Sequence, residues 1–258
     1  MALSGELGQA RLFHLAAPPS DGRARLTAED ERHALAVLRM KAGDELFGGD
    51  GQGRAWPLEV HSAGKAGLEL RVAGAELNEP RPGTEASALP WIEVAVSLPR
   101  GGRSEEMLAR LTQLGASAVT PLVCERAQGP TREPGAAKAE HLRRAIREAC
   151  KQCRRLWIPE LREPCTPTDL RRQLPSCQLL ALDPRAPLGL LEWIRAHAAT
   201  KARKPIALAI GPEGGFTREE QEILRAAGAS EARLGAYILR VETAAEAAVA
   251  VLVAALGA

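Results

Sequence analysis

From Trp91 to the C-terminus, short apolar runs alternate with stretches of helical periodicity, and this alternation constrains the fold most strongly. The predicted strands are Ile92–Leu98, Ala118–Val123, Cys177–Leu182, Ile206–Ile210 and Ala232–Leu234. The predicted helices are Ser104–Leu114, Lys138–Arg155, Leu188–His197, Thr217–Ala227 and Thr243–Leu256. This succession predicts an α/β domain with a mainly parallel sheet, in which ligands bind beyond the carboxyl ends of the strands.

The first 75 residues have a different pattern, which predicts a small β-rich domain. Two apolar runs flank the glycine-rich turn in GDELFGGDGQGRAWPLEV, as in a β-hairpin, and Gly67–Val72 alternates like a third strand. Before them, TAEDERHALAVLRM predicts a helix with Thr27 as its N-cap. Three prolines then interrupt all periodicity. We therefore expect domains at residues 1–75 and 91–258, joined by a linker at residues 76–90.

Composition indicates a soluble globular protein, because 45% of the residues are hydrophobic and 26% are charged. The N-terminus lacks the pattern of a secretory signal, and five cysteines, an odd number, argue against a disulfide framework. We therefore expect a cytoplasmic protein. The net charge is only +2, but residues 81–165 carry 14 basic and 10 acidic side chains, so positive charge is concentrated in the middle of the chain.

The stretch IGPEGGFTREE, from Ile210 to Glu220, joins a predicted strand to a predicted helix. It lacks the Gly-Lys-Ser/Thr of a phosphate-binding P-loop and the spacing of a dinucleotide fingerprint. Glu213 would also repel a phosphate. The plainest interpretation is a tight turn followed by a helix that Thr217 and Glu220 cap.

A second stretch, LGAYILRVETA, precedes the alanine-rich terminal helix. Thr243 and Glu246 form another potential capping box, so Thr243 has a structural explanation. No such explanation accounts for Arg240 and Glu242, although isolated surface charges often simply pair with one another.

Together, IGPEGGFTREE and LGAYILRVETA resemble the paired signature of the RsmE-type 16S ribosomal RNA methyltransferases, a branch of the SPOUT superfamily. Three further segments resemble the same family: RHALAVLRMKAGDEL, EEMLARLTQLGASAVTPLVCER and AIREACKQCRRLWIPEL. The resemblance implies a PUA-like β-barrel before a SPOUT-type α/β domain with a trefoil knot. It also implies a homodimer that uses S-adenosyl-L-methionine to methylate N3 of a uridine in 16S rRNA of the small ribosomal subunit.

By the same resemblance, two loops form the walls of a cofactor pocket. The implied cofactor-binding residues are Leu182, Gly211, Glu213, Gly214, Gly215, Leu234, Gly235, Ile238, Leu239 and Thr243. A sulfonium and an ammonium cation suit an acidic loop better than a phosphate does. Because N3 of uracil must lose a proton before it can be methylated, we expect Arg240 to stabilise charge on the uracil oxygens. We expect Glu242 to orient Arg240 or to assist proton removal.

The central helix supplies a candidate RNA surface, because six basic residues and one acidic residue lie between His141 and Arg155. On the sequence alone, a merely solvated helix face is the favoured interpretation. With the resemblance, phosphate contact is favoured. The expected RNA-binding residues are Arg39, Arg143, Arg147, Lys151, Arg154 and Arg155. Cys150 and Cys153 lack further ligands at metal-site spacing, so we expect them to be helix residues and expect no metal.

The chain departs from the usual family pattern at several positions. Gln113 and Val241 replace a common glutamate and a common threonine, Lys151 replaces a frequent glutamate, and Ala236-Tyr237 replaces a frequent Pro-Arg. These changes leave two alternatives open. One is a ribosome-assembly protein that binds RNA without catalysis, and the other is a methyltransferase that acts on a different RNA.

Overall fold

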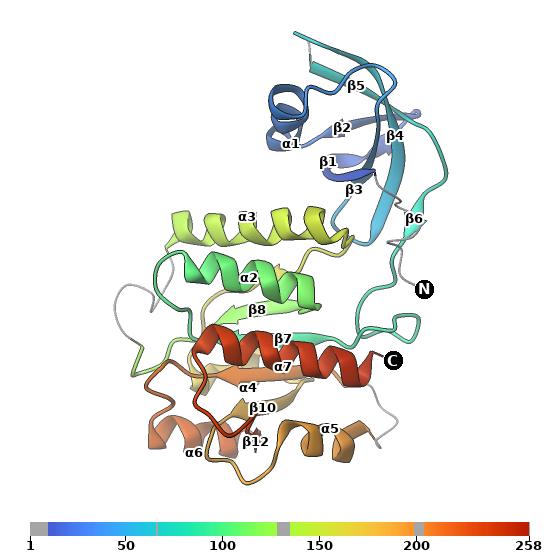
Figure 1. Cartoon of the computed structure of the whole chain (residues 1–258). Helices are drawn as coiled ribbons and strands as arrows, with labels where there is room; N and C mark the ends of the chain where they lie inside the picture. Colours follow the sequence, from blue (N-terminus) through green and yellow to red (C-terminus); the bar gives the residue numbers. More distant parts are fainter. Residues whose placement is uncertain (1–9, 66, 128–134, 199–203, 258) are drawn as a thin grey trace. The chain divides into compact units, whose positions relative to one another are not determined.

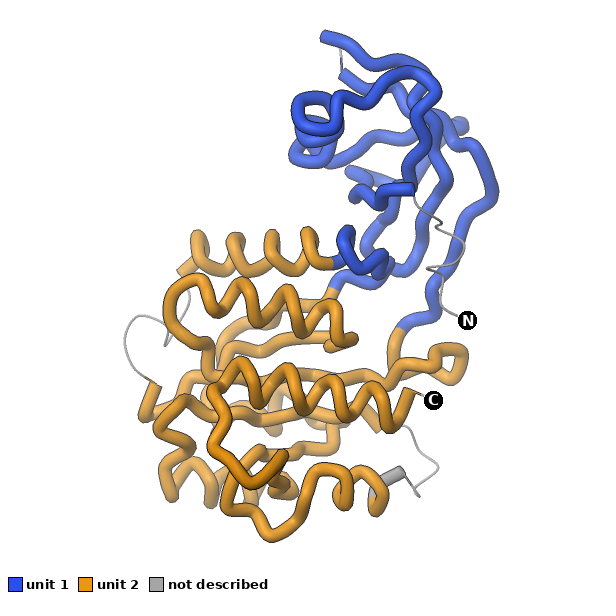
Figure 2. The backbone as a smooth tube through the Cα atoms, viewed as in Figure 1, with its two compact units in different colours: residues 1–81, 150–158 blue, residues 82–149, 159–258 orange. Residues whose placement is uncertain are grey.

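The structure is a computed structural model that describes residues 10–65, 67–127, 135–198 and 204–257. The expectation about a secretory signal therefore rests partly on residues outside the described part. The chain divides into two compact units (Figure 2): residues 1–81 with 150–158, and residues 82–149 with 159–258. No helix in the described ranges is long and apolar enough to cross a membrane.

The first unit contains a small closed β-barrel. Its strands are β1 (Arg11–Ser20), β2 (Arg23–Leu26), β3 (Glu45–Gly49), β4 (Arg54–Gly64), β5 (Gly67–Val72) and β6 (Leu77–Asn78). The order is β3-β1-β2-β5-β4-β6, and β3 also pairs with β4, which closes five strands into a ring. The β3–β4 pair is the predicted hairpin, and β5 is the predicted third strand.

One predicted helix of this unit forms as two short elements, α1 (Ala28–Arg32) and the π-helical η2 (His33–Val37). The Thr27 side chain accepts a hydrogen bond from the backbone N–H of Asp30 at 3.3 Å, so the predicted N-cap is confirmed. Ala34, which is fully buried, packs with strand residues such as Phe13 and Leu58 in the core of the barrel.

Residues Cys150–Ile158, called the return segment below, belong to the first unit although they follow it by about 70 residues. Leu156 is buried against Leu12 and Phe47. Backbone N–H groups of the segment donate to the Glu79 carboxylate at 2.6 and 3.1 Å, and the Ile158 N–H donates to the Gly51 carbonyl at 3.0 Å. The return segment is thus part of the barrel unit. The expected first domain, residues 1–75, does not include this segment.

The second unit is built on a parallel six-stranded sheet (Figure 1). Its strands are β7 (Ile92–Val96), β8 (Ala118–Pro121), β9 (Glu160–Leu161), β10 (Gln178–Leu182), β11 (Ile206–Ile210) and β12 (Ser230–Ala232). Its helices are α2 (Arg103–Leu114), α3 (Ala136–Cys153, whose last residues fall in the first unit), α4 (Pro167–Gln173), α5 (Leu190–Ala198), α6 (Arg218–Ala226) and α7 (Val241–Leu256). The predicted α/β class is confirmed; the knot stays a prediction.

The strand order is β12-β10-β11-β7-β8-β9, and every neighbouring pair is parallel. The carboxyl ends of β10, β11 and β12 therefore meet at one edge of the sheet. Three loops leave the sheet there, and the loops after β11 and β12 carry the two glycine-containing sequences. This edge is the place where an open parallel sheet binds ligands.

Candidate cofactor and catalytic site

A pocket of about 480 Å³ lies at this edge of the second unit. Its walls come from the loops after β10, β11 and β12 and from the first turn of α7. The residues that line it include Arg126, Leu182, Asp183, Arg185, Gly211, Glu213, Gly214, Gly215, Phe216, Gln221, Leu234, Gly235, Tyr237, Ile238, Leu239, Val241 and Ala244. Apolar side chains from the loop after β12 thus face carboxylates and backbone from the other two loops.

The loop after β11 is held in place at its C-terminal end. Gly215 has φ +67°, a left-handed conformation that favours glycine, while Phe216 next to it is buried. Beyond it, the Glu220 carboxylate accepts a hydrogen bond from the Thr217 N–H at 2.8 Å, and the Thr217 hydroxyl accepts one from the Glu220 N–H at 3.2 Å. The predicted capping box is therefore confirmed.

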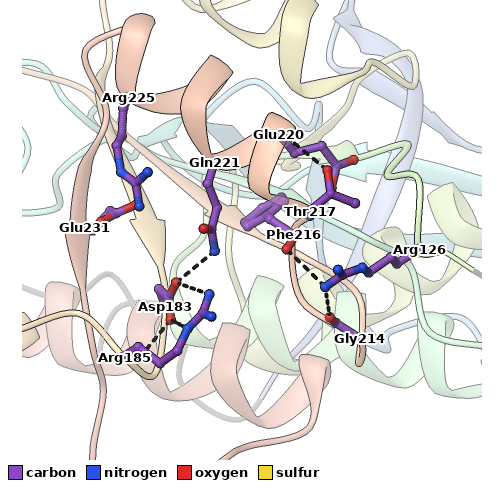
Figure 3. A network of polar contacts seen from close by, with 10 residues as sticks. All are labelled: Arg126, Asp183, Arg185, Gly214, Phe216, Thr217, Glu220, Gln221, Arg225 and Glu231. Carbon is purple, nitrogen blue, oxygen red and sulfur yellow. Dashed lines mark hydrogen bonds and ion pairs between the residues drawn. The ribbon is translucent and has the colours of Figure 1, made fainter.

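A segment after β8 also fastens this loop (Figure 3). The Arg126 guanidinium donates to the carbonyls of Gly214 at 2.9 Å and Phe216 at 3.3 Å. The second oxygen of Glu220 accepts from the Glu125 N–H at 2.8 Å. Two residues from a different part of the chain thus fix the backbone that forms one wall of the pocket.

The loop after β12 presents apolar side chains to solvent and to the pocket. Tyr237 and Ile238 are each 84% exposed, and Leu239 is 38% exposed. Single exposed apolar residues are ordinary, but three in succession beside a pocket indicate a surface that binds something.

The loop after β10 adds a carboxylate that we did not predict. Asp183 follows Leu182 directly, and its oxygens accept hydrogen bonds from Arg185 at 3.0 and 3.1 Å and from the Gln221 amide at 3.0 Å (Figure 3). The hydrogen bonds from Arg185 lower the pKa of Asp183, so the group stays ionised. Its position immediately after a strand at the carboxyl edge is the signal that could have revealed it.

The structure brings together nine of the ten residues expected to bind the cofactor; Thr243 does not line the pocket. The capping box predicted for Thr243 and Glu246 is wrong, because α7 begins at Val241 and its N-cap is Arg240. Thr243 consequently lies within the helix, where its side chain is exposed. Val241 and Ala244, which line the pocket, were not predicted.

The expected catalytic residues flank the pocket without lining it. Arg240 is exposed, and its side chain makes no hydrogen bond or ion pair with any residue that the structure describes. The Glu242 side chain is only 12% exposed, and its Oε1 accepts from Arg103 at 3.3 Å. Glu242 is therefore paired with Arg103, not with Arg240 as we expected.

The six expected RNA-binding residues differ in their surroundings. Arg39 is exposed and Arg154 is half-buried. Arg143 lies 3.9 Å from both Glu140 and Glu163, and Arg147 lies 2.7 Å from Glu140, so these two are partly exposed cations in surface ion pairs.

Lys151 and Arg155 do not fit the expectation of a phosphate-binding surface. The Lys151 ammonium is paired with Asp30 inside the barrel unit, and the two side chains are 13% and 3% exposed. Arg155 is only 8% exposed. Both residues lie in the return segment, where packing against the barrel withdraws them from solvent.

The cysteines have the properties of packed side chains. Cys150 and Cys153 lie in the last turn of α3, as predicted, and Cys150 is buried. Burial raises the pKa of Cys150 to about 12 and the pKa values of Cys165 and Cys177 to about 11, so these thiols stay protonated near neutral pH. Within the described ranges, no group of three His, Cys, Asp or Glu side chains could hold a metal ion.

Comparison with known proteins identifies the class. A family model of an RNA methyltransferase domain matches residues 86–253, and a model of an RNA methyltransferase PUA domain matches residues 26–73. The barrel, the parallel sheet and the pocket thus belong to an RNA methyltransferase with a PUA domain.

The relatives narrow this class to one family. The ribosomal RNA small subunit methyltransferase E of Mycobacterium bovis is 32% identical over 92% of this chain and 88% of its own length. That of a Synechocystis species is also 32% identical, over 85% of this chain and 69% of its own length. The chain belongs to the ribosomal RNA small subunit methyltransferase E family.

Solved structures agree with this assignment. A Legionella pneumophila protein in complex with the cofactor SAM has a TM-score of 0.83 and 30% identity, and the alignment covers 96% of this chain and 98% of that one. The Neisseria gonorrhoeae member of the family, bound to S-adenosyl methionine, has a TM-score of 0.80 and 25% identity over 95% and 98% of the two chains.

Proposed function

We propose that this protein transfers a methyl group from S-adenosyl-L-methionine to N3 of a specific uridine in 16S rRNA of the small ribosomal subunit. The observation that carries the proposal is the pocket, which is formed by the loops after β10, β11 and β12 in a chain of this family.

The residues of the pocket fit the cofactor chemically. Leu234, Ile238 and Leu239 offer an apolar surface for an adenine ring, while Glu213 and Asp183 supply negative charge beside a donor that carries two cationic groups. Gly211, Gly214 and Gly215 of the glycine-containing loop also line the pocket. S-adenosylmethionine, when bound, supplies an electrophilic methyl group.

Methylation also requires removal of the proton on N3 of uracil. In this proposal the Glu242 carboxylate accepts that proton, and the Arg240 guanidinium stabilises the negative charge that the uracil oxygens acquire. Because Arg240 is exposed at the start of α7 and has no side-chain partner among the described residues, it is free to meet a substrate. Arg240→Ala should abolish most transfer and leave cofactor binding intact; near wild-type transfer by this variant would exclude the role.

The substrate must reach the pocket as an unpaired or flipped base, because N3 lies on the pairing edge. Arg143 and Arg147 on α3, with Arg39 and Arg154, are the cations we assign to phosphate contact. We further propose a homodimer, with the exposed Tyr237 and Ile238 as candidates for contact with RNA or a partner subunit. We also propose that the protein acts in the cytoplasm.

The test uses undermethylated small subunits, labelled S-adenosylmethionine and mapping of the modified nucleotide. Transfer to N3 of one uridine of 16S rRNA is expected. Cofactor binding without transfer would favour a ribosome-assembly protein that only binds RNA, and transfer to a different RNA would favour another substrate. Naked 16S rRNA serves as the second substrate, because comparison with intact subunits shows which form is recognised.

A further inference from the structure

Arg103, the first residue of α2, lies between a carboxylate of the loop after β11 and a carboxylate in the first turn of α7. Its Nη1 donates to Glu242 Oε1 at 3.3 Å, and its Nη2 lies 4.0 Å from Glu213 Oε1. Arg103 belongs to neither glycine-containing sequence and lies 139 residues before Glu242. One guanidinium thus connects the loop after β11 with the start of α7.

The two contacts differ in strength. The Glu213 side chain is 60% exposed, and an exposed pair at 4.0 Å contributes little. The Glu242 side chain is 12% exposed, and its Oε2 is buried without a hydrogen-bond partner in the described part of the chain. A carboxylate in such surroundings is costly unless a cation compensates it, so the contact with Glu242 is the important one.

We propose that Arg103 is a positioning residue for methyl transfer: it holds the Glu242 carboxylate in a fixed orientation beside the pocket. The inference rests on the proposed function, because it concerns the residue that accepts the N3 proton. Val241 and Ala244, the neighbours of Glu242 in the first turn of α7, line the pocket, so a small rotation of the Glu242 side chain changes where its second oxygen, Oε2, lies relative to the pocket. Arg103 restrains that rotation from α2.

The same two helices provide a matched control. Further along, Arg110 of α2 donates to Glu246 of α7 at 3.1 Å, and the Glu246 side chain is 21% exposed. This pair repeats the chemistry of Arg103 and Glu242, but the carboxylates beside Arg110, Glu106 and Glu246, do not line the pocket, whereas Glu213 beside Arg103 does. An effect of Arg103 that reflects only helix packing should therefore appear equally in Arg110→Gln.

The experiment compares wild-type protein with Arg103→Gln, Arg103→Lys, Glu242→Gln, the Arg103→Gln/Glu242→Gln double variant and Arg110→Gln. Transfer kinetics with small subunits and calorimetry with S-adenosylmethionine separate kcat from cofactor affinity. Urea unfolding without cofactor measures the coupling between Arg103 and Glu242 independently of activity. Arg103→Gln should lower kcat by about tenfold or more, because a misplaced catalytic group loses rate without losing binding.

In that variant the cofactor Kd should stay within about threefold of wild type. Arg103→Lys should recover part of the rate, the double variant should be no slower than Glu242→Gln, and Arg110→Gln should transfer like wild type. If the kcat of Arg103→Gln is within about twofold of wild type, or if the losses multiply in the double variant, the positioning role of Arg103 is overturned, but the proposed function is not. A wild-type protein that binds cofactor but transfers no methyl would overturn the proposed function as well.

Discussion

Replacing Glu220 by alanine removes the side chain that fastens the cofactor loop from two directions. Glu220 is 8% exposed, and its two oxygens accept from the backbone N–H groups of Thr217 and Glu125, each at 2.8 Å. The first bond caps α6, and the second ties the segment after β8 to the first turn of α6, which directly follows the cofactor loop. Glu220→Ala leaves both donors without these acceptors.

The expected loss of stability follows from those two bonds. A lost cap costs about 1 kcal/mol, and a poorly solvated N–H left without its acceptor costs about 1–3 kcal/mol, so the free energy of unfolding should fall by roughly 3 kcal/mol. In a protein of this size, that loss corresponds to a fall in Tm of about 6–12 °C. Because the loop lines the pocket, the Kd for S-adenosylmethionine should also rise.

Thermal unfolding followed by circular dichroism, together with calorimetry of cofactor binding, provides the measurement. Glu222→Ala is the matched control, because Glu222 lies on the same helix in an exposed pair with Arg218. That variant should lose less than about 1 kcal/mol. Equal losses from Glu220→Ala and Glu222→Ala would refute the view that Glu220 fastens the loop.

Three further predictions concern charge and burial. Lys151→Met should lower the free energy of unfolding in urea by about 3 kcal/mol, because it leaves the buried Asp30 carboxylate without the Lys151 ammonium. Adding Asp30→Asn should restore part of this loss. Equal stability of Lys151→Met and wild type would contradict the prediction. RNA affinity should fall steeply as the salt concentration rises. The double variant Arg143→Gln/Arg147→Gln should flatten the slope of log affinity against log salt concentration by about 0.7 for each lost phosphate contact, whereas Arg172→Gln on α4 should leave that slope unchanged. Burial raises the pKa values of Cys150, Cys165 and Cys177, so iodoacetamide at pH 8 should label them slowly in the native protein and quickly in urea; fast native labelling would show that these thiols are accessible.

The parts of the fold that depend on local patterns could be predicted from the sequence. The parallel sheet followed from alternating strand and helix patterns, and the cap at Thr217 followed from a four-residue motif. The start of α7 was misplaced because Thr243 and Glu246 have the spacing of a capping box, whereas the chain is already helical from Val241. Local chemistry alone does not decide between two adjacent starting points.

Features that depend on distant partners could not be predicted. Leu156 and Glu79 are 77 residues apart, and nothing near Leu156 in the sequence indicates that its N–H donates to that carboxylate. The basic residues Lys151 and Arg155 therefore had the same appearance as the exposed cations of α3. The contact between Arg103 and Glu242 was missed for the same reason, although most of the pocket followed from resemblance to the family.

The return segment also affects the order in which the chain can fold during synthesis. N-terminal domains generally fold first as they leave the ribosome, but here Leu12 and Phe47 are covered by Leu156. The barrel unit cannot complete its core until the chain has been made as far as Ile158, well into the sequence of the second unit. A nascent chain that ends near residue 90 is therefore a partly exposed intermediate, and a fragment cut there would lack one edge of its own core.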